Sequence, residues 1–202
     1  MKKMIIFDMD GVLIDACDWH RDALNIALKK TCNYEISLEE HYKIYNALPT
    51  RVKLKKLSEC GVVPEDKIEE IEELKQEETI NIIKQKAKKD RSKIQLMEYL
   101  KKNNILIGCY TNSVKKTASM MLDLVGILKY FDIFVTNQDV EKSKPHPEGY
   151  NLCSEKLKIH KKNILIVEDS EKGIEAAIAA NIDFIKVKNA TEVNIDLFKE
   201  LL

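Results

Sequence analysis

The chain has 202 residues, a length that suits one core domain carrying an insert, and its 33 basic and 33 acidic residues cancel. A neutral chain has no global field that would draw it to nucleic acid or to an anionic membrane, so we expect a small molecule as its partner. Five cysteines without a C-x-x-C pair argue against a disulfide framework and a zinc site, and the lack of a membrane span or signal sequence indicates a cytoplasmic protein.

The first predicted strand, residues 4–7, is short and apolar and is followed at once by Asp8 and Asp10, with Asp15 a few residues later. Two carboxylates at positions i and i+2 of an extended backbone point the same way, and Gly11 lets the chain turn close to a ligand. Such acids repel one another unless a cation, a proton or a reacting group holds them together. We therefore expect Mg²⁺ at this strand end, with a phosphate group brought to it.

Residues 16–88 carry only helical patterns, which predict an all-helical cap inserted directly after the first strand. Helices are expected near 17–31, 37–47 and 50–59, followed by one long amphipathic helix that spans residues 68–82. Because this insert begins beside the acidic residues, it could close over them.

Three cap residues are candidate substrate contacts. His20 lies beside an apolar stripe, where a structural histidine is the alternative interpretation. Arg51 lies near the start of a helix, where a bound anion would relieve the conflict between its charge and the helix dipole. Lys75 lies on the apolar side of the long helix, and it either reaches a substrate or extends along the surface to water.

From residue 94 onward, short apolar runs alternate with helical patterns, which predicts a parallel sheet with helices on both faces. The expected strands are 105–110, 133–135, 164–167 and 184–187, and the expected helices are 113–128, 147–157 and 170–180. Ser170 should cap the last helix and Asn181 should end it. The sequence thus predicts an α/β core domain at 1–15 and 89–202.

Three of the predicted strands end in polar residues, and ligands bind at the carboxyl ends of parallel strands. Thr111 and Asn112 follow one strand, and Glu168 and Asp169 follow another. Between them, a proline-stiffened loop presents Lys144. Acids, a hydroxyl, an amide and a cation therefore come together from distant parts of the chain.

These groups suit phosphoryl transfer, which needs an in-line nucleophile, charge neutralisation and a proton for the leaving group. Asp8 can be the nucleophile that forms an aspartyl phosphate. Asp10 can protonate the leaving alkoxide and later deprotonate the attacking water. Thr111 and Lys144 would hold the phosphoryl oxygens. Thr111 could also cap the following helix, and the two roles are compatible because a helix N-terminus is itself a phosphate site.

A magnesium site needs hard oxygen ligands, and Asp8, the backbone carbonyl of Asp10 and Asp169 are a sufficient set. Glu168 is either a further metal ligand or an acid that holds the ligands in place without contacting the metal. Asp15 either caps the first cap helix or serves as a hinge. Gly11 and Asn112 complete the expected substrate contacts.

In four ordered motifs the chain resembles the haloacid dehalogenase superfamily of phosphohydrolases. The motifs are Asp8-x-Asp10-Gly-Val, Thr111-Asn112, Lys144-Pro145 and Glu168-Asp169-Ser170-x-x-Gly173-Ile174. This resemblance implies a Rossmann-like core, a helical cap after the first strand, dependence on Mg²⁺ and an aspartyl-phosphate intermediate. The Asp15, His20 and Pro-Thr-Arg51 positions look most similar to the subgroup of β-phosphoglucomutase and small sugar-phosphate phosphatases.

The leading hypothesis is therefore a Mg²⁺-dependent phosphatase of a small metabolite, namely a sugar or polyol phosphate. A phosphomutase of the β-phosphoglucomutase type is the nearest alternative, because such enzymes use cap groups resembling His20, Arg51 and Lys75. Dehalogenation is disfavoured, because dehalogenases of the superfamily do not need a second acid at the Asp10 position. A phosphoacceptor signalling domain would lack the helical insert, and a catalytically silent binding domain is the remaining alternative. Substrate choice is expected to depend on the cap, and the sequence indicates no particular oligomeric state.

Overall fold

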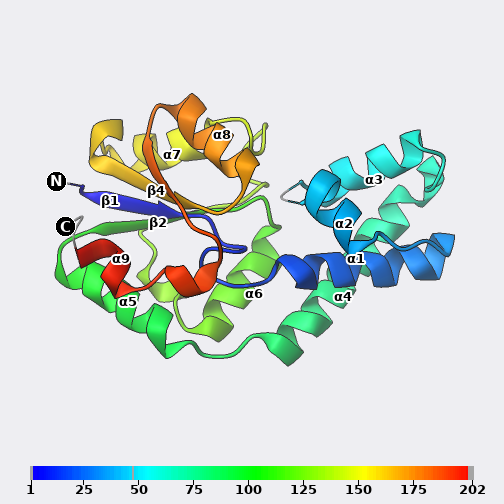
Figure 1. Cartoon of the computed structure of the whole chain (residues 1–202), viewed down its shortest axis with the longest axis horizontal. Helices are drawn as coiled ribbons and strands as arrows, with labels where there is room; N and C mark the ends of the chain where they lie inside the picture. Colours follow the sequence, from blue (N-terminus) through cyan, green and yellow to red (C-terminus); the bar gives the residue numbers. More distant parts are fainter. Residues whose placement is uncertain (1, 47, 200–202) are drawn as a thin grey trace. The chain divides into compact units, whose positions relative to one another are not determined.

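The computed structural model describes residues 2–46 and 48–199, and in it the chain forms two units (Figure 1). The larger contains the residues up to Asp15 and those from Lys88 onward, and the smaller is Ala16–Ala87. The sequence places residue 88 in the cap, whereas Lys88 belongs to the larger unit.

The larger unit is built on a five-stranded parallel sheet (Figure 1). Its strands are β1 (Met4–Phe7), β2 (Leu106–Tyr110), β3 (Ile133–Val135), β4 (Ile164–Glu168) and β5 (Asp183–Lys186), in the spatial order β3-β2-β1-β4-β5. The central strand β1 is entirely buried, and its Phe7 lies opposite Cys109 on one side and Val167 on the other. Continuous apolar runs suit strands that are covered on both faces. The predicted α/β fold class is confirmed.

Helices cover both faces of this sheet (Figure 1). On one face, α7 (Glu148–Leu157) and α8 (Glu171–Ala180) pack on a core that includes Met4 and Ile6. The other face carries α5 (Arg91–Lys102), α6 (Lys115–Val125) and α9 (Ile195–Lys199), and here Phe7 and Phe198 meet edge to face with 5.8 Å between ring centroids. Three 3₁₀ turns connect the elements, at Leu128–Tyr130, Lys161–Asn163 and Ala190–Glu192.

The ends of two helices test the predicted boundaries. Ser170 caps α8 by accepting a hydrogen bond from the backbone N–H of Gly173, and Asn181 ends it in the left-handed region at φ 56°, as predicted. Helix α6 is shorter than the predicted 113–128. Its N-cap is Val114, without a side-chain bond, and Gly126 ends it at φ 89°. The interpretation of Thr111 as the cap of this helix is therefore wrong.

In the smaller unit, every regular element among the described residues, 16–46 and 48–87, is a helix or a helical turn. It contains α1 (Cys17–Cys32), α2 (Leu38–Glu40), a π-helical turn (His41–Tyr45), α3 (Thr50–Glu59), a 3₁₀ turn (Glu65–Lys67) and α4 (Ile68–Lys86). Apolar residues of α1, α3 and α4, among them Leu28, Leu57 and Ile71, form its core. The predicted helix 37–47 is thus α2 followed by a π turn, and its last residue, Ala47, lies outside the described residues.

The five cysteines are free thiols. Across residues 2–46 and 48–199, no helix combines the length and the apolar character that a membrane crossing requires.

Candidate active site

The candidate site lies where the chain order of the sheet reverses. Strands β1 and β4 are neighbours there, although β2 and β3 come between them in the sequence, and such a reversal leaves a crevice at the carboxyl ends of the strands. Asp8 directly follows β1, and its backbone N–H donates to Val167 of β4 at 2.9 Å. Asp169 directly follows β4. The topology thus brings the first and fourth motifs together.

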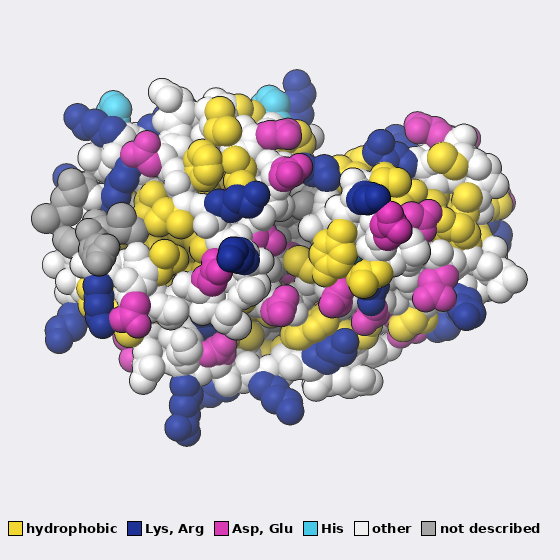
Figure 2. Space-filling model, viewed as in Figure 1, with side chains coloured by type: hydrophobic (Ala, Val, Ile, Leu, Met, Phe, Trp, Pro, Cys, Tyr) yellow, Lys and Arg dark blue, Asp and Glu magenta, His cyan; other side chains and the backbone are white. Residues whose placement is uncertain are grey.

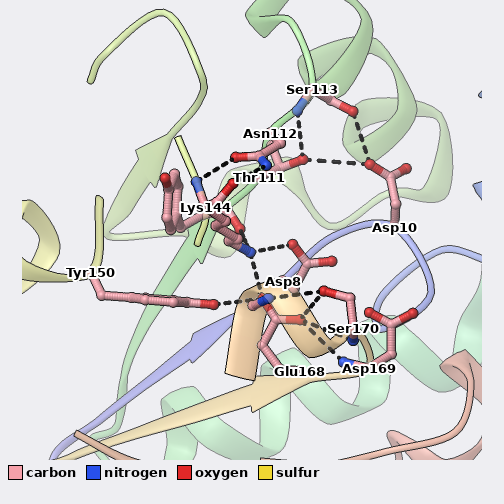
Figure 3. A network of polar contacts seen from close by, with 12 residues as sticks. Asp8, Asp10, Thr111, Asn112, Ser113, Lys144, Tyr150, Glu168, Asp169 and Ser170 are labelled. Atoms are coloured by element: carbon pink, nitrogen blue, oxygen red, sulfur yellow. Dashed lines mark hydrogen bonds and ion pairs between the residues drawn. The ribbon is translucent and has the colours of Figure 1, made fainter. Parts of the chain in front are cut away.

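Three carboxylates gather at this point (Figure 3). Oxygens of Asp8, Glu168 and Asp169 all lie within 4.8 Å of one another. Gly11 makes room for them, because a methyl group on it would overlap the Asp169 carboxylate, and its φ of 91° also favours glycine. The space and the backbone conformation at this position therefore explain why residue 11 is a glycine, whether or not it contacts a substrate.

Lys144 is buried beside these carboxylates (Figure 3). Its ammonium group donates to Asp8 Oδ1 at 2.5 Å, to Glu168 Oε1 at 2.6 Å and to the carbonyl oxygen of Tyr110 at 2.9 Å. Burial alone would lower the pKa of Lys144, but Asp8 and Glu168 outweigh it and hold this pKa well above its ordinary value. The site thus contains a permanent cation against Asp8.

Glu168 is fully buried, and its two oxygens have different partners. Oε1 accepts hydrogen bonds from Lys144 and from the Tyr150 hydroxyl, the latter at 2.7 Å. Oε2 accepts from the Ser170 hydroxyl at 3.2 Å and from the backbone N–H groups of Asp169 and Ser170. Five donors already occupy this carboxylate, an arrangement that suits support of Lys144 better than a further bond to a metal ion.

Asp10 points away from the carboxylate group and toward the second motif (Figure 3). Its Oδ2 accepts from the Ser113 hydroxyl at 2.9 Å and from the Thr111 hydroxyl at 3.4 Å. Thr111 also accepts from the backbone N–H of Ser113 at 3.0 Å. The two hydroxyls therefore hold the Asp10 carboxylate in one orientation beside the second motif.

Asn112 binds the backbone of the lysine loop. Its Oδ1 accepts from the N–H of Lys144 at 3.2 Å, and its Nδ2 donates to the carbonyl oxygen of the same residue at 3.4 Å. The predicted substrate contact is thus engaged in placing Lys144. This double contact joins the second and third motifs.

The residues of the carboxylate group fit a divalent cation such as Mg²⁺. Burial and the charge of Glu168 raise the pKa of Asp169 to about 7, and burial also raises the pKa of Asp8 well above its usual range. Within the described atoms, the buried Oδ1 of Asp169 has no hydrogen-bond partner. A hard cation among these oxygens would relieve their repulsion and give Asp169 a partner.

The cap candidates have partners within their own unit. Lys75 is buried, and its Nζ lies 3.4 Å from Nδ1 of His20, so Lys75 does not extend to water as the alternative interpretation supposed. Arg51 pairs with Glu72 at 3.1 Å, and its side chain is 57% exposed. A carboxylate of the cap itself therefore relieves the conflict between Arg51 and the start of α3.

Asp15 does not cap the first cap helix. The N-cap of α1 is Ala16, and no side chain bonds there. Asp15 is exposed and ends the first segment of the larger unit, which leaves the hinge interpretation.

The sequence did not predict Ser113 or Tyr150 as members of this network. It predicted Ser170 as a helix cap, but not as a partner of Glu168. Ser113 lies two positions after Thr111, and the same i, i+2 argument that joined Asp8 to Asp10 could have indicated it. Tyr150 lies inside a predicted helix, and no local pattern distinguishes it from a core residue. Only the packing of α7 on the sheet, which brings the Tyr150 hydroxyl to Glu168 at the end of β4, shows its role.

Comparisons with known proteins agree with this arrangement. The sequence matches the haloacid dehalogenase-like hydrolases over residues 5–187. A phosphorylated carbohydrates phosphatase of Thermotoga maritima is 29% identical over 181 residues, which cover 90% of this chain and 82% of that protein. The pyrophosphatase PpaX of Oceanobacillus iheyensis is 28% identical over 188 residues, covering 89% of this chain and 80% of that one.

The fold is also similar to that of a solved structure, the β-phosphoglucomutase of Clostridium difficile. The TM-score is 0.83 at 23% identity, and the match covers 98% of this chain and 94% of that one. On its ordered motifs, its parallel sheet and its match over residues 5–187, the chain belongs to the haloacid dehalogenase-like hydrolases.

Proposed function

We propose that this haloacid dehalogenase-type phosphatase hydrolyses the phosphate monoester of a small metabolite, a sugar or polyol phosphate, with the help of Mg²⁺. The observation that carries the proposal is the carboxylate group of Asp8, Glu168 and Asp169 with the ammonium of Lys144 against Asp8. The Thermotoga maritima relative, named a phosphorylated carbohydrates phosphatase, supports the substrate class.

In the first step, a carboxylate oxygen of Asp8 attacks phosphorus, and the bond from phosphorus to the ester oxygen breaks. The leaving alkoxide takes a proton from Asp10, which Ser113 and Thr111 hold in place. In the second step, water attacks the aspartyl phosphate and gives its proton to Asp10. Inorganic phosphate leaves, and Asp8 and Asp10 return to their starting forms.

Lys144 supplies a fixed positive charge to this reaction. Its N–H that donates to Asp8 lies next to the attacking atom, where it can shift to a phosphoryl oxygen. The Thr111 hydroxyl can donate to another of these oxygens. Asn112 acts through the backbone of Lys144, to which it makes two hydrogen bonds.

Asp8, Asp169 and the backbone carbonyl of Asp10 would hold the metal ion. Mg²⁺, when bound, would neutralise charge on the carboxylates and on the phosphoryl oxygens. Glu168 already has five donors, and we assign it to the support of Lys144.

A screen for phosphate release tests the proposal. The panel contains sugar, polyol, nucleotide and amino-acid phosphates, each with and without Mg²⁺. Release from a sugar or polyol phosphate that needs Mg²⁺ and disappears in Asp8→Asn supports the proposal. Folded protein that binds Mg²⁺ and hydrolyses nothing on the panel contradicts it.

One observation favours a second candidate, a phosphomutase. His20 and Lys75 lie within hydrogen-bond reach of each other in the cap, and such a pair could move a proton on a sugar hydroxyl. Conversion of a hexose 1-phosphate to its 6-phosphate, without net phosphate release, would decide for the mutase. A loss of that conversion in His20→Gln would assign it to the pair.

The free cysteines and the balanced charge support the cytoplasm as the compartment and a small phosphorylated metabolite as the partner.

A further inference from the structure

The ammonium group of Lys144 lies beside two aromatic rings as well as two carboxylates. Its Nζ is 4.7 Å from the centroid of the Tyr110 ring and 5.2 Å from that of Tyr150. The two rings meet edge to face, with 5.0 Å between their centroids and an angle of 89°. Both tyrosines are fully buried, and attraction between a cation and an aromatic ring is strongest where water is excluded. We refer to these two residues as the tyrosine pair.

Tyr150 also acts on Lys144 through a hydrogen bond. Its hydroxyl donates to Oε1 of Glu168 at 2.7 Å, and the same oxygen accepts from Lys144 at 2.6 Å (Figure 3). The hydroxyl thus restrains the carboxylate that restrains the ammonium. The Tyr150 hydroxyl thus acts on Glu168, the carboxylate that we assign to the support of Lys144 and not to the metal ion.

The backbone beside Tyr150 makes room for the second ring. Gly149 precedes it on α7, and a methyl group at this position would overlap the ring of Tyr110. Tyr110 can therefore lie against α7 only because residue 149 has no side chain. Strand β2 and helix α7 thus each contribute one aromatic ring beside Lys144.

We propose that Tyr150 is a positioning residue, which together with the ring of Tyr110 fixes the ammonium group of Lys144 against Asp8. The inference rests on the proposed function, in which Lys144 stabilises charge on the phosphoryl group. A lysine has a flexible four-carbon stem and three rotatable donors, so its charge stabilises a transition state best when neighbouring groups fix its position beforehand. In this site, the tyrosine pair and Glu168 supply that restraint.

The kinetic test is Tyr150→Phe, which keeps the ring and removes only the hydroxyl. We expect kcat to fall about tenfold, as for the loss of one hydrogen bond to a charged group, with KM and the Mg²⁺ activation constant within about twofold of wild type. Tyr150→Leu, which also removes the ring, should lose about a further tenfold. General damage to the site would instead raise KM and weaken activation by Mg²⁺.

Tyr130→Phe is the matched control. Tyr130 also donates to a glutamate, Glu98, at 2.9 Å, but on the surface of the same unit and away from the site. Removal of the Tyr130 hydroxyl should leave kcat unchanged. If Tyr150→Phe keeps kcat within twofold of wild type while folded by circular dichroism, the proposal is overturned.

A second measurement follows the lysine directly and needs no substrate. In protein with ¹⁵N-labelled lysine, buried ammonium groups exchange slowly and give separate signals, and Lys144→Met assigns the one from Lys144. We expect Tyr150→Phe to shift or broaden this signal. It should leave unchanged the signal of Lys93, which is buried elsewhere and donates to the carbonyl oxygens of Ala190 and Val193.

This second measurement separates the two proposals. A shifted Lys144 signal in protein that hydrolyses no phosphate ester supports the positioning role and contradicts the proposed function. An unchanged Lys144 signal contradicts the positioning role, whether or not the wild type is a phosphatase.

Discussion

Nζ of Lys144 lies 2.5 Å from Oδ1 of Asp8, although 136 positions separate the two residues in the chain. The pair forms because Asp8 directly follows β1 and because Asn112, which follows the neighbouring strand β2, binds the backbone of Lys144 in the loop before α7. Both side chains are buried, so their charges interact with little screening by water. A nucleophile and a cation are thus in contact before any substrate arrives.

Asp8→Asn should abolish phosphate release, by about a thousandfold or more, because an amide cannot form the aspartyl phosphate. The variant should fold, since it replaces one of several buried acids by a neutral group of the same shape and lowers their mutual repulsion. Single-turnover release of phosphate from the best substrate of the panel measures the effect.

Asp123→Asn makes the same chemical change at an exposed position of α6 and should retain full activity. Activity of Asp8→Asn within tenfold of wild type would show that another residue is the nucleophile.

Lys144→Met should destabilise the protein by about 3–5 kcal/mol, because it leaves Glu168 buried without its cation. Urea unfolding measures this change in the free energy of unfolding. Glu168→Gln added to Lys144→Met should restore part of the lost stability, since it removes the unpaired charge. A double variant less stable than Lys144→Met would refute this account.

The control for this experiment is an ion pair on the surface with the same nitrogen–oxygen distance. Lys101 lies 2.5 Å from Asp132, but the two side chains are 34% and 25% exposed. Lys101→Met should cost less than about 1 kcal/mol, because water screens exposed pairs. The comparison isolates burial, since the distance in the two pairs is the same.

The parts of the site that could be predicted follow from one rule of topology. Strands β1 and β3 have the predicted bounds, and the residues after β1, β2 and β4 meet because parallel strands end at one edge of the sheet. Asp8, Thr111 and Asp169, each the first residue after its strand, could be placed together on this basis alone. The rule needs only the strands and their parallel direction, both of which the alternation of apolar runs and helical patterns predicts.

The parts that could not be predicted depend on side-chain packing between distant elements. Tyr150 reaches Glu168 only because α7 is rotated to bury it, and a helical pattern does not contain that rotation. Arg51 shows the same limit. Its position at the start of α3 suggested a bound anion, but its partner is Glu72, 21 positions later on α4.

The raised pKa of Asp169 predicts a pH dependence in the metal-free protein. Its folded-state pKa is about 7 and the ordinary value is 3.8, so the folded state retains a proton that the unfolded chain has released. This contribution to stability is complete below pH 3.8 and is lost as the pH rises through about 7. Mg²⁺ competes with the same proton, so it should raise Tm more at pH 8 than at pH 6.

Thermal unfolding with Mg²⁺ or with EDTA at the two pH values measures this effect. Asp169→Asn should show neither the pH-dependent loss of stability nor the larger Mg²⁺ effect at pH 8. The exposed Asp123→Asn should behave like wild type. An equal Tm increase from Mg²⁺ at both pH values would contradict the assignment of Asp169 as a ligand.

His41 predicts that the stability of the cap falls as the pH is lowered, the opposite of the dependence expected from Asp169. It is 1% exposed, and neither ring nitrogen has a hydrogen-bond partner among the described atoms. Burial, with the charges of Lys53 and Arg21 nearby, lowers its pKa from 6.5 to about 4. Because the folded state resists protonation, the neutral ring contributes stability above pH 6.5 that is lost as the pH falls through about 4.

His41→Phe keeps an aromatic ring and removes the two unpaired nitrogens, so it should stabilise the protein by about 1 kcal/mol at pH 7.5. The gain should grow as the pH falls to 5, because only the wild type must then bury a group that favours protonation. Urea unfolding at the two pH values measures both effects. His146→Phe, at an exposed loop position, is the control and should show no such growth. A gain for His41→Phe that is the same at both pH values would mean that the ring of His41 takes up a proton in the folded protein as readily as in the unfolded chain.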